Sequence, residues 1–229
     1  ILKNRITILV ILSALTIFFG YQWKNLSMTY TEANLLPKDH IANKDYQKFL
    51  DKFGEEGNLI VIGFQDKNLF TPKNYAAWNE LMTGLKKSKE VDLVVSLNDL
   101  KKLEKDTVNE KFVLTPFIDQ SKVLDPAYLK KAQDELFNNL PFYEGLLFNK
   151  KSGSVRSAIY MNKALVNTAE RKTFILKTLV PKIDKFEKTT GIDLKVSGMP
   201  YIRTINADNM KGEIGLFIGA SLLTVSLIF

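Results

Sequence analysis

The sequence predicts an α+β fold in which a folded α/β domain lies between two apolar, membrane-crossing helices. Two observations support this prediction: both ends of the 229-residue chain are apolar, and the polar middle alternates between strand-like and helix-like patterns. We therefore expect a first transmembrane helix over 1–24, an external α/β domain over 25–203, and the start of a second transmembrane helix over 204–229.

The first apolar segment, from Ile6 to Trp23, carries no charge and has about the 18 residues that a transmembrane helix requires. Lys3 and Arg5 precede it, and cationic residues mark the cytoplasmic side of a span. We therefore expect the N-terminus inside and the following domain outside the membrane. A cleaved signal peptide is the alternative interpretation, but no small-x-small cleavage pattern follows this segment.

The second apolar segment, from Ile214 to Phe229, also carries no charge. A core helix normally shows a polar stripe, whereas this segment contains small residues that suit close helix packing in lipid: Gly215, Gly219 and Ala220. We interpret the chain as the first part of a larger membrane protein, ending within its second span. The alternative is a self-contained chain with a hydrophobic terminal helix.

Between these segments, the first strand–helix–strand unit covers residues 58–97. Short apolar, β-branched runs predict buried strands over 58–65 and 91–97. A helix is expected between them, with Thr71 as the capping residue and Pro72 at the first helical position. The pattern is typical of a βαβ unit.

A second unit follows after a long, less regular insertion over 98–145. Its strands are expected over 154–162 and 192–198, and its helix over 168–190, where Pro181 should cause a kink. Two such units predict a split βαβ, or ferredoxin-like, module with both helices on one face of a sheet.

Further elements are predicted around these two units. They are a β-leaning segment over 25–37, an amphipathic helix between Pro37 and Gly54, a helix over 126–139, a turn at 151–153, and a helix capped by Thr204 or Asn206 that runs into the second span.

The sequence contains no recognisable catalytic constellation. The single His40 and the absence of Cys leave too few side chains for a His-based triad or a zinc site. We therefore expect no enzymatic activity, no catalytic residue, no metal and no cofactor. His40 is best explained as a solvated residue at a helix start.

The net charge of +7 is the other compositional feature with functional meaning. Because the Lys residues are interleaved with Asp and Glu, the charge favours a solvated surface over a nucleic-acid partner. One Lys-rich helix could meet anionic lipid headgroups, with a solvated face as the alternative: Lys172, Lys177, Lys182, Lys185 and Lys188.

Several short motifs occur in a characteristic order. An apolar-Pro motif with a following acid comes after the first span, a strand ends in a Val-x-x-Val-x-Ser-Leu stretch, and a Gly-x-Pro element precedes the second span; the matching residues are Leu35, Leu36, Pro37, Asp39, Val91, Val94, Ser96, Leu97, Gly198 and Pro200. In this order the chain resembles exporters of the resistance-nodulation-division (RND) superfamily, specifically the MMPL-like lipid exporters.

The resemblance implies an inner-membrane, multi-pass exporter of bacteria with a periplasmic porter domain. Such an exporter moves lipids or other hydrophobic molecules out of the membrane, driven by the proton gradient. The partners implied are the bilayer, the hydrophobic substrate, the remaining transmembrane helices, and a second copy or an envelope protein. The proton-relay acids of the family would lie beyond Phe229, so none is assigned here.

We expect the substrate to pass an apolar cleft lined by aromatic residues of the insertion. The candidate substrate-path residues, for which core packing is the alternative role, are Phe117, Phe137, Phe142, Tyr143 and Phe148.

Two other functions share the order of span, domain and span. A signalling receptor would use the external domain as a ligand sensor, and an envelope scaffold subunit would use it to bind another protein. A transporter continues into further spans, whereas a receptor continues into a charged cytoplasmic helix and an output domain.

Overall fold

The computed structural model describes residues 4–22, 37, 39–53 and 57–228. The chain divides into two compact units, Ile1–Leu35 and Leu36–Phe229. The first unit contains helix α1, Arg5–Gln22, which agrees with the helix predicted at this end. Its apolar portion, Ile6–Gln22, is a short apolar helix. The β-leaning segment predicted over 25–37 lies outside the described residues, apart from Pro37.

Helix α2, Ile41–Phe53, opens the second unit and matches the amphipathic helix predicted after Pro37. His40 is exposed, and its Nδ1 atom accepts a hydrogen bond from Ala42 N at 3.2 Å. His40 therefore satisfies one of the free amide groups at the helix start.

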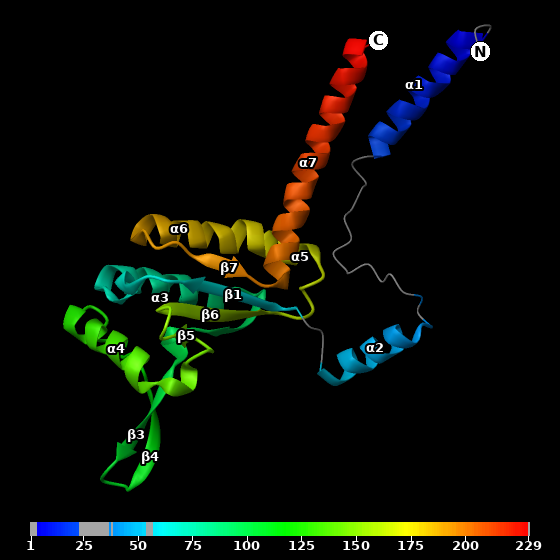
Figure 1. Cartoon of the computed structure of the whole chain (residues 1–229). Helices are drawn as coiled ribbons and strands as arrows, with labels where there is room; N and C mark the ends of the chain where they lie inside the picture. The colour runs from blue at the N-terminus through cyan, green and yellow to red at the C-terminus, as the bar shows by residue number, and fades with distance from the viewer. Residues whose placement is uncertain (1–3, 23–36, 38, 54–56, 229) are drawn as a thin grey trace. The chain divides into compact units, whose positions relative to one another are not determined.

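An antiparallel sheet forms the centre of the second unit (Figure 1). Its strands run in the order β2 (Val91–Val95), β6 (Ser154–Met161), β1 (Leu59–Phe64) and β7 (Lys195–Ser197), and the short β5 (Phe148–Asn149) pairs with the start of β6. Each neighbouring pair is antiparallel. Consequently β1 and β2 run in the same direction with β6 between them, and β6 and β7 do so with β1 between them.

A helical connection joins each of these two parallel pairs of strands. Helix α3, Pro72–Lys86, connects β1 to β2. The other connection runs from β6 to β7 through α5 (Ala169–Phe174), a π-helical turn (Ile175–Leu179) and α6 (Val180–Thr190). The predicted helix over 168–190 is therefore present, and its departure from α geometry ends just before Pro181. Proline has no amide hydrogen and cannot donate the hydrogen bond to the preceding turn of a helix. A widened turn before Pro181 accommodates this missing hydrogen bond.

Both connections pack on the same face of the sheet, as Figure 1 shows for α3 and α6. Trp78 of α3 contacts Phe64 of β1 and Phe186 of α6 in edge-to-face geometry, with ring centroids 5.3 and 5.8 Å apart. Ile60 and Ile62 alternate with half-buried residues along β1 and point into the same core. The sheet and its two helical connections therefore share one hydrophobic core.

The insertion between β2 and β5 is more regular than the sequence indicates. It contains a hairpin of β3 (Lys101–Asp106) and β4 (Lys111–Pro116), which the sequence analysis did not predict. The helix α4, Pro126–Asn139, follows with the predicted bounds. The side chain of Asp125 caps it by accepting a hydrogen bond from Ala127 N at 2.8 Å.

Helix α7, Met199–Ile228, closes the described chain and begins before the predicted cap. The prediction of a cap at Thr204 or Asn206 is wrong, because Thr204 lies buried inside the helix and donates its hydroxyl to Pro200 O at 2.8 Å. Gly198 separates α7 from β7 and has a φ of +115°. The last strand therefore passes directly into this helix.

Candidate functional site

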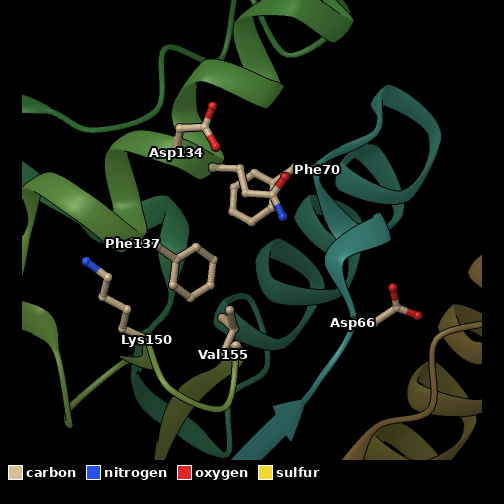
Figure 2. Close-up of a pocket in the computed structure, with 8 residues that line it drawn as sticks. Asp66, Phe70, Asp134, Phe137, Lys150 and Val155 are labelled. Carbon is tan, nitrogen blue, oxygen red and sulfur yellow. The ribbon is translucent and has the colours of Figure 1, made fainter.

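A cavity of about 300 Å³ opens between α4, the β5–β6 turn and the end of β1 (Figure 2). Its wall combines apolar and charged side chains: Asp66, Phe70, Gln133, Asp134, Phe137, Lys150, Gly153 and Val155. This volume is at the lower end of the range for small-molecule pockets, which is about 300–1,000 Å³.

Aromatic and aliphatic side chains form the deeper part of this cavity. Phe70 and Val155 are buried, and Phe137 of α4 lines the same cavity (Figure 2). The ring of Phe137 packs edge-to-face on Phe148, with centroids 5.3 Å apart. The apolar wall is therefore continuous with the protein core and is held in position by it.

Charged side chains occupy the rim of the same cavity. Asp66 lies before the short 3₁₀-helix Lys67–Phe70 and caps it, since its Oδ1 atom accepts a hydrogen bond from Asn68 N at 2.7 Å. Asp134 of α4 and Lys150 of the β5–β6 turn also line the cavity (Figure 2). An apolar wall below a rim of both charges suits an amphiphilic molecule better than a purely polar one.

The predicted substrate-path residues fall into different environments. Phe137 lines the cavity, whereas Phe117 and Phe148 are buried in the core, in agreement with the alternative of core packing. Phe142 is 79% exposed and contacts the half-buried Tyr143, with centroids 5.1 Å apart. The structure thus pairs Phe137 with Phe148, and Phe142 with Tyr143.

A second cavity, of about 360 Å³, is polar and lies beside α3. Asn98 accepts a hydrogen bond from the Tyr75 hydroxyl at 2.6 Å and donates to Asn79 at 2.8 Å. Asn79 in turn donates to Gln120 of the insertion at 3.2 Å. Burial raises the pKa of Tyr75, so the phenol stays neutral and remains a donor. No sequence pattern predicts this chain of amides, because its members are far apart in sequence and form no motif.

No group of three or more His, Cys, Asp or Glu residues that could hold a metal ion occurs in the described ranges. Three charged residues of the two cavities, Asp66, Lys86 and Asp99, instead pair with neighbouring groups. Asp99, for example, accepts hydrogen bonds from Ser96 Oγ at 2.9 Å and from Lys86 Nζ at 3.0 Å. These hydrogen bonds hold the loops and helices that border the cavities in position.

Within the part of the chain that the structure covers, Met199–Ile228 is a helix long and apolar enough to cross a membrane. Its first turns pack on the domain, where Pro200 and Thr204 are buried. Asp208 accepts a hydrogen bond from Lys172 of α5 at 2.7 Å. Beyond these contacts the helix is exposed along its apolar length.

Comparison with protein-family models finds no match for this chain, and no curated protein matches it either. The structure shows an α+β domain with a long apolar helix at its end. The site and the sequence motifs are the observations that bear on its function.

Proposed function

We propose that this chain is part of an RND-superfamily, MMPL-like exporter that moves lipids or other hydrophobic molecules across the inner membrane, driven by the proton gradient. The chain would supply the first transmembrane helix, a periplasmic porter domain and the second transmembrane helix. The ordered motifs that end in Gly198 and Pro200 motivate this proposal.

The junction between β7 and α7 is the observation on which the proposal chiefly depends. The helix begins at Met199, directly after the strand and Gly198, and continues through thirty residues. Because Pro200 and Thr204 are buried in the domain, the helix and the sheet have to move together. A transporter that changes shape needs such a connection between its external domain and its spans.

The connectivity of the sheet also supports a porter-type domain. The strand order β2-β6-β1-β7, with helical connections on one face, is the order of a split βαβ module. Lys3 and Arg5 before the first apolar helix favour an external location of this module.

The cavity beside Phe137 supplies an apolar surface for a hydrophobic substrate. Proton coupling would require acids within a span, and Ile214–Ile228 contains none. This chain would therefore contribute substrate passage and conformational change, while other spans provide coupling.

A signalling receptor is the second candidate, and the uninterrupted α7 is the observation that favours it. A continuous helix between a sensor domain and the membrane can transmit a displacement. Transport activity separates the two functions, since a receptor does not accumulate a hydrophobic probe.

We expect inverted membrane vesicles that contain the complete protein to accumulate Nile red when they are energised, and a protonophore to abolish the accumulation. Phe142→Ala removes an exposed aromatic surface and should lower the initial rate about fivefold, as expected for loss of one aromatic contact. Leu124→Ala, at a side chain that is 76% exposed, is the matched control and should retain the wild-type rate.

Accumulation that persists with the protonophore, or that equals the value of vesicles without the protein, would contradict the proposal. Near-ultraviolet circular dichroism of the Phe142→Ala protein separates a transport defect from unfolding. If that spectrum is lost, Phe142 belongs to the packing of the domain and not to the substrate path.

A further inference from the structure

The hairpin β3–β4 has one face whose residues are all exposed to solvent. Cross-strand pairing places Lys101 opposite Pro116, Leu103 opposite Leu114, and Lys105 opposite Phe112. Because opposed residues of an antiparallel pair share a face, these six residues form one surface, which we call the outer hairpin face.

Three large apolar side chains of the outer hairpin face are open to solvent. Leu103, Phe112 and Leu114 are 62%, 68% and 61% exposed. Single exposed apolar residues are ordinary, but a contiguous group on one face marks an interaction surface. An isolated two-stranded hairpin is also only marginally stable in water, so a partner that covers this face would stabilise it.

The opposite face and the base of the hairpin are attached to the domain. Lys102 bonds to Glu104 at 3.0 Å and to Glu135 of α4 at 3.3 Å. The hydroxyl of Tyr143 donates to Lys101 O at 2.9 Å and accepts from Lys101 N at 3.3 Å. The hairpin is therefore held in position with its outer face turned away from the rest of the domain.

The position of the hairpin argues against lipid as the occupant. The hairpin follows the end of β2, whereas α7 leaves the sheet at the end of β7, beside the start of β1. Since β1 and β2 run in the same direction, these two points lie at opposite ends of the sheet, about 20 Å apart for strands of this length. In Figure 1 the hairpin and the apolar end of α7 extend away from the sheet in different directions.

The charges of the outer hairpin face define the partner. Lys101 and Lys105 flank the apolar side chains, and none of the six residues is acidic. Two copies of this face brought together would place Lys against Lys, which disfavours a symmetric pair. We propose that the outer hairpin face docks another protein, whose contact surface is apolar and bordered by Asp or Glu.

The test uses the complete protein in the membranes of cells that produce it. The photoreactive residue benzoylphenylalanine replaces Phe112, and in a control it replaces the exposed Leu124 of a separate loop. We expect light to produce an adduct with a different protein from position 112 only. Mass spectrometry of the adduct should identify a contact peptide that carries Asp or Glu.

Charge reversal then tests the chemistry of the contact. Lys105→Glu should lower the yield of the adduct at least about tenfold, while Lys105→Arg should keep it. Lys111→Glu is the matched control, because Lys111 is exposed on the opposite face of the same hairpin and its reversal should leave the yield unchanged.

Several results would overturn the proposal. They are no adduct at position 112, an equal adduct at position 124, an adduct with lipid or with a second copy of the chain, and equal yields from the Lys105→Glu and Lys111→Glu proteins. Hydrogen exchange of the hairpin amides checks that the variants remain folded. If Lys105→Glu unfolds the hairpin, Lys101→Glu replaces it, because Tyr143 holds the backbone at that position.

Discussion

Gly198 shows how a single residue determines the connection between the sheet and α7. Its φ of +115° is a conformation that L side chains rarely adopt. A Cβ atom at this position would lie 2.2 Å from Leu59 O and 2.8 Å from Ile60 Cα. The strand β7 can therefore approach β1 and turn into the helix only because this residue has no side chain.

We predict that Gly198→Ala lowers the free energy of unfolding by about 2–4 kcal/mol, since it combines backbone strain with a steric clash. Gly153→Ala is the control: Gly153 also has a positive φ, but a Cβ atom there would meet nothing within 4 Å, so the loss should be about 1 kcal/mol. Chemical unfolding in detergent, followed by tryptophan fluorescence, measures both. Equal losses would contradict the close approach at Gly198.

Tyr75 gives the domain a predictable response to alkaline pH. Burial, followed by the nearby Tyr128 and Asp99, raises the pKa of its phenol above the usual value. The unfolded chain loses this proton near pH ~10, whereas the folded chain keeps it. The contribution of Tyr75 to stability is therefore complete below about pH 10 and is lost as the pH rises further.

Above about pH 10, we predict that the free energy of unfolding of the wild-type protein decreases with pH. Tyr75 accounts for up to about 1.4 kcal/mol of this decrease per pH unit. Tyr75→Phe lacks the contribution, and loss of the hydrogen bond to Asn98 lowers its stability by about 1 kcal/mol at neutral pH. Unfolding curves at neutral and alkaline pH test both effects. The same pH dependence in the two proteins would contradict a buried, neutral phenol.

At the scale of elements, the sequence predicts the core helices and strands better than it predicts the insertion. The strands β1 and β6 and the helices α3 and α4 follow from apolar patterns and from Pro at a first helical position. The hairpin β3–β4 escapes prediction because β3 has a single apolar residue, Leu103, among charged ones. The apolar run of β4 has only three residues, from Phe112 to Leu114, and it lies outside the core, so it is shorter than the runs that predict a buried strand.

The same reasoning explains why the candidate substrate-path residues lie in different environments. Composition identifies aromatic residues in the insertion, but it does not distinguish Phe137 at a cavity from Phe117 and Phe148 in the core. Burial depends on contacts between distant segments, which a single sequence does not reveal.

The start of α3 is a comparable case. Pro72 begins the helix as predicted, yet the Thr71 hydroxyl donates to Asn68 O and makes no capping hydrogen bond to the helix.

Trp78 joins the sheet to both helical connections, and we predict that Trp78→Ala lowers the free energy of unfolding by about 3–5 kcal/mol. The side chain is fully buried and contacts Phe64 and Phe186. Phe112→Ala is the control for loss of a large aromatic residue at an exposed site, with an expected change below about 0.5 kcal/mol. Circular dichroism during thermal unfolding measures both, and similar effects would contradict a shared core.

At the scale of the whole molecule, an α+β domain is joined to a helix that is long and apolar enough to cross a membrane. The first turns of α7 belong to the domain through Pro200, Thr204 and the ion pair of Asp208 with Lys172. From Ile214 to Ile228 the helix carries no charge and is exposed, which suits lipid. In the proposed function, this one continuous helix belongs to both the domain and the membrane, with the domain on the external side.

Cysteine accessibility tests this claim most directly, because the chain has no Cys of its own. We predict that Lys130→Cys, on the exposed surface of α4, reacts with a membrane-impermeant maleimide added outside intact cells, and that Leu222→Cys in α7 reacts only after detergent is added. Labelling of Leu222→Cys in intact membranes, or labelling of Lys130→Cys only from the cytoplasmic side, would contradict the account.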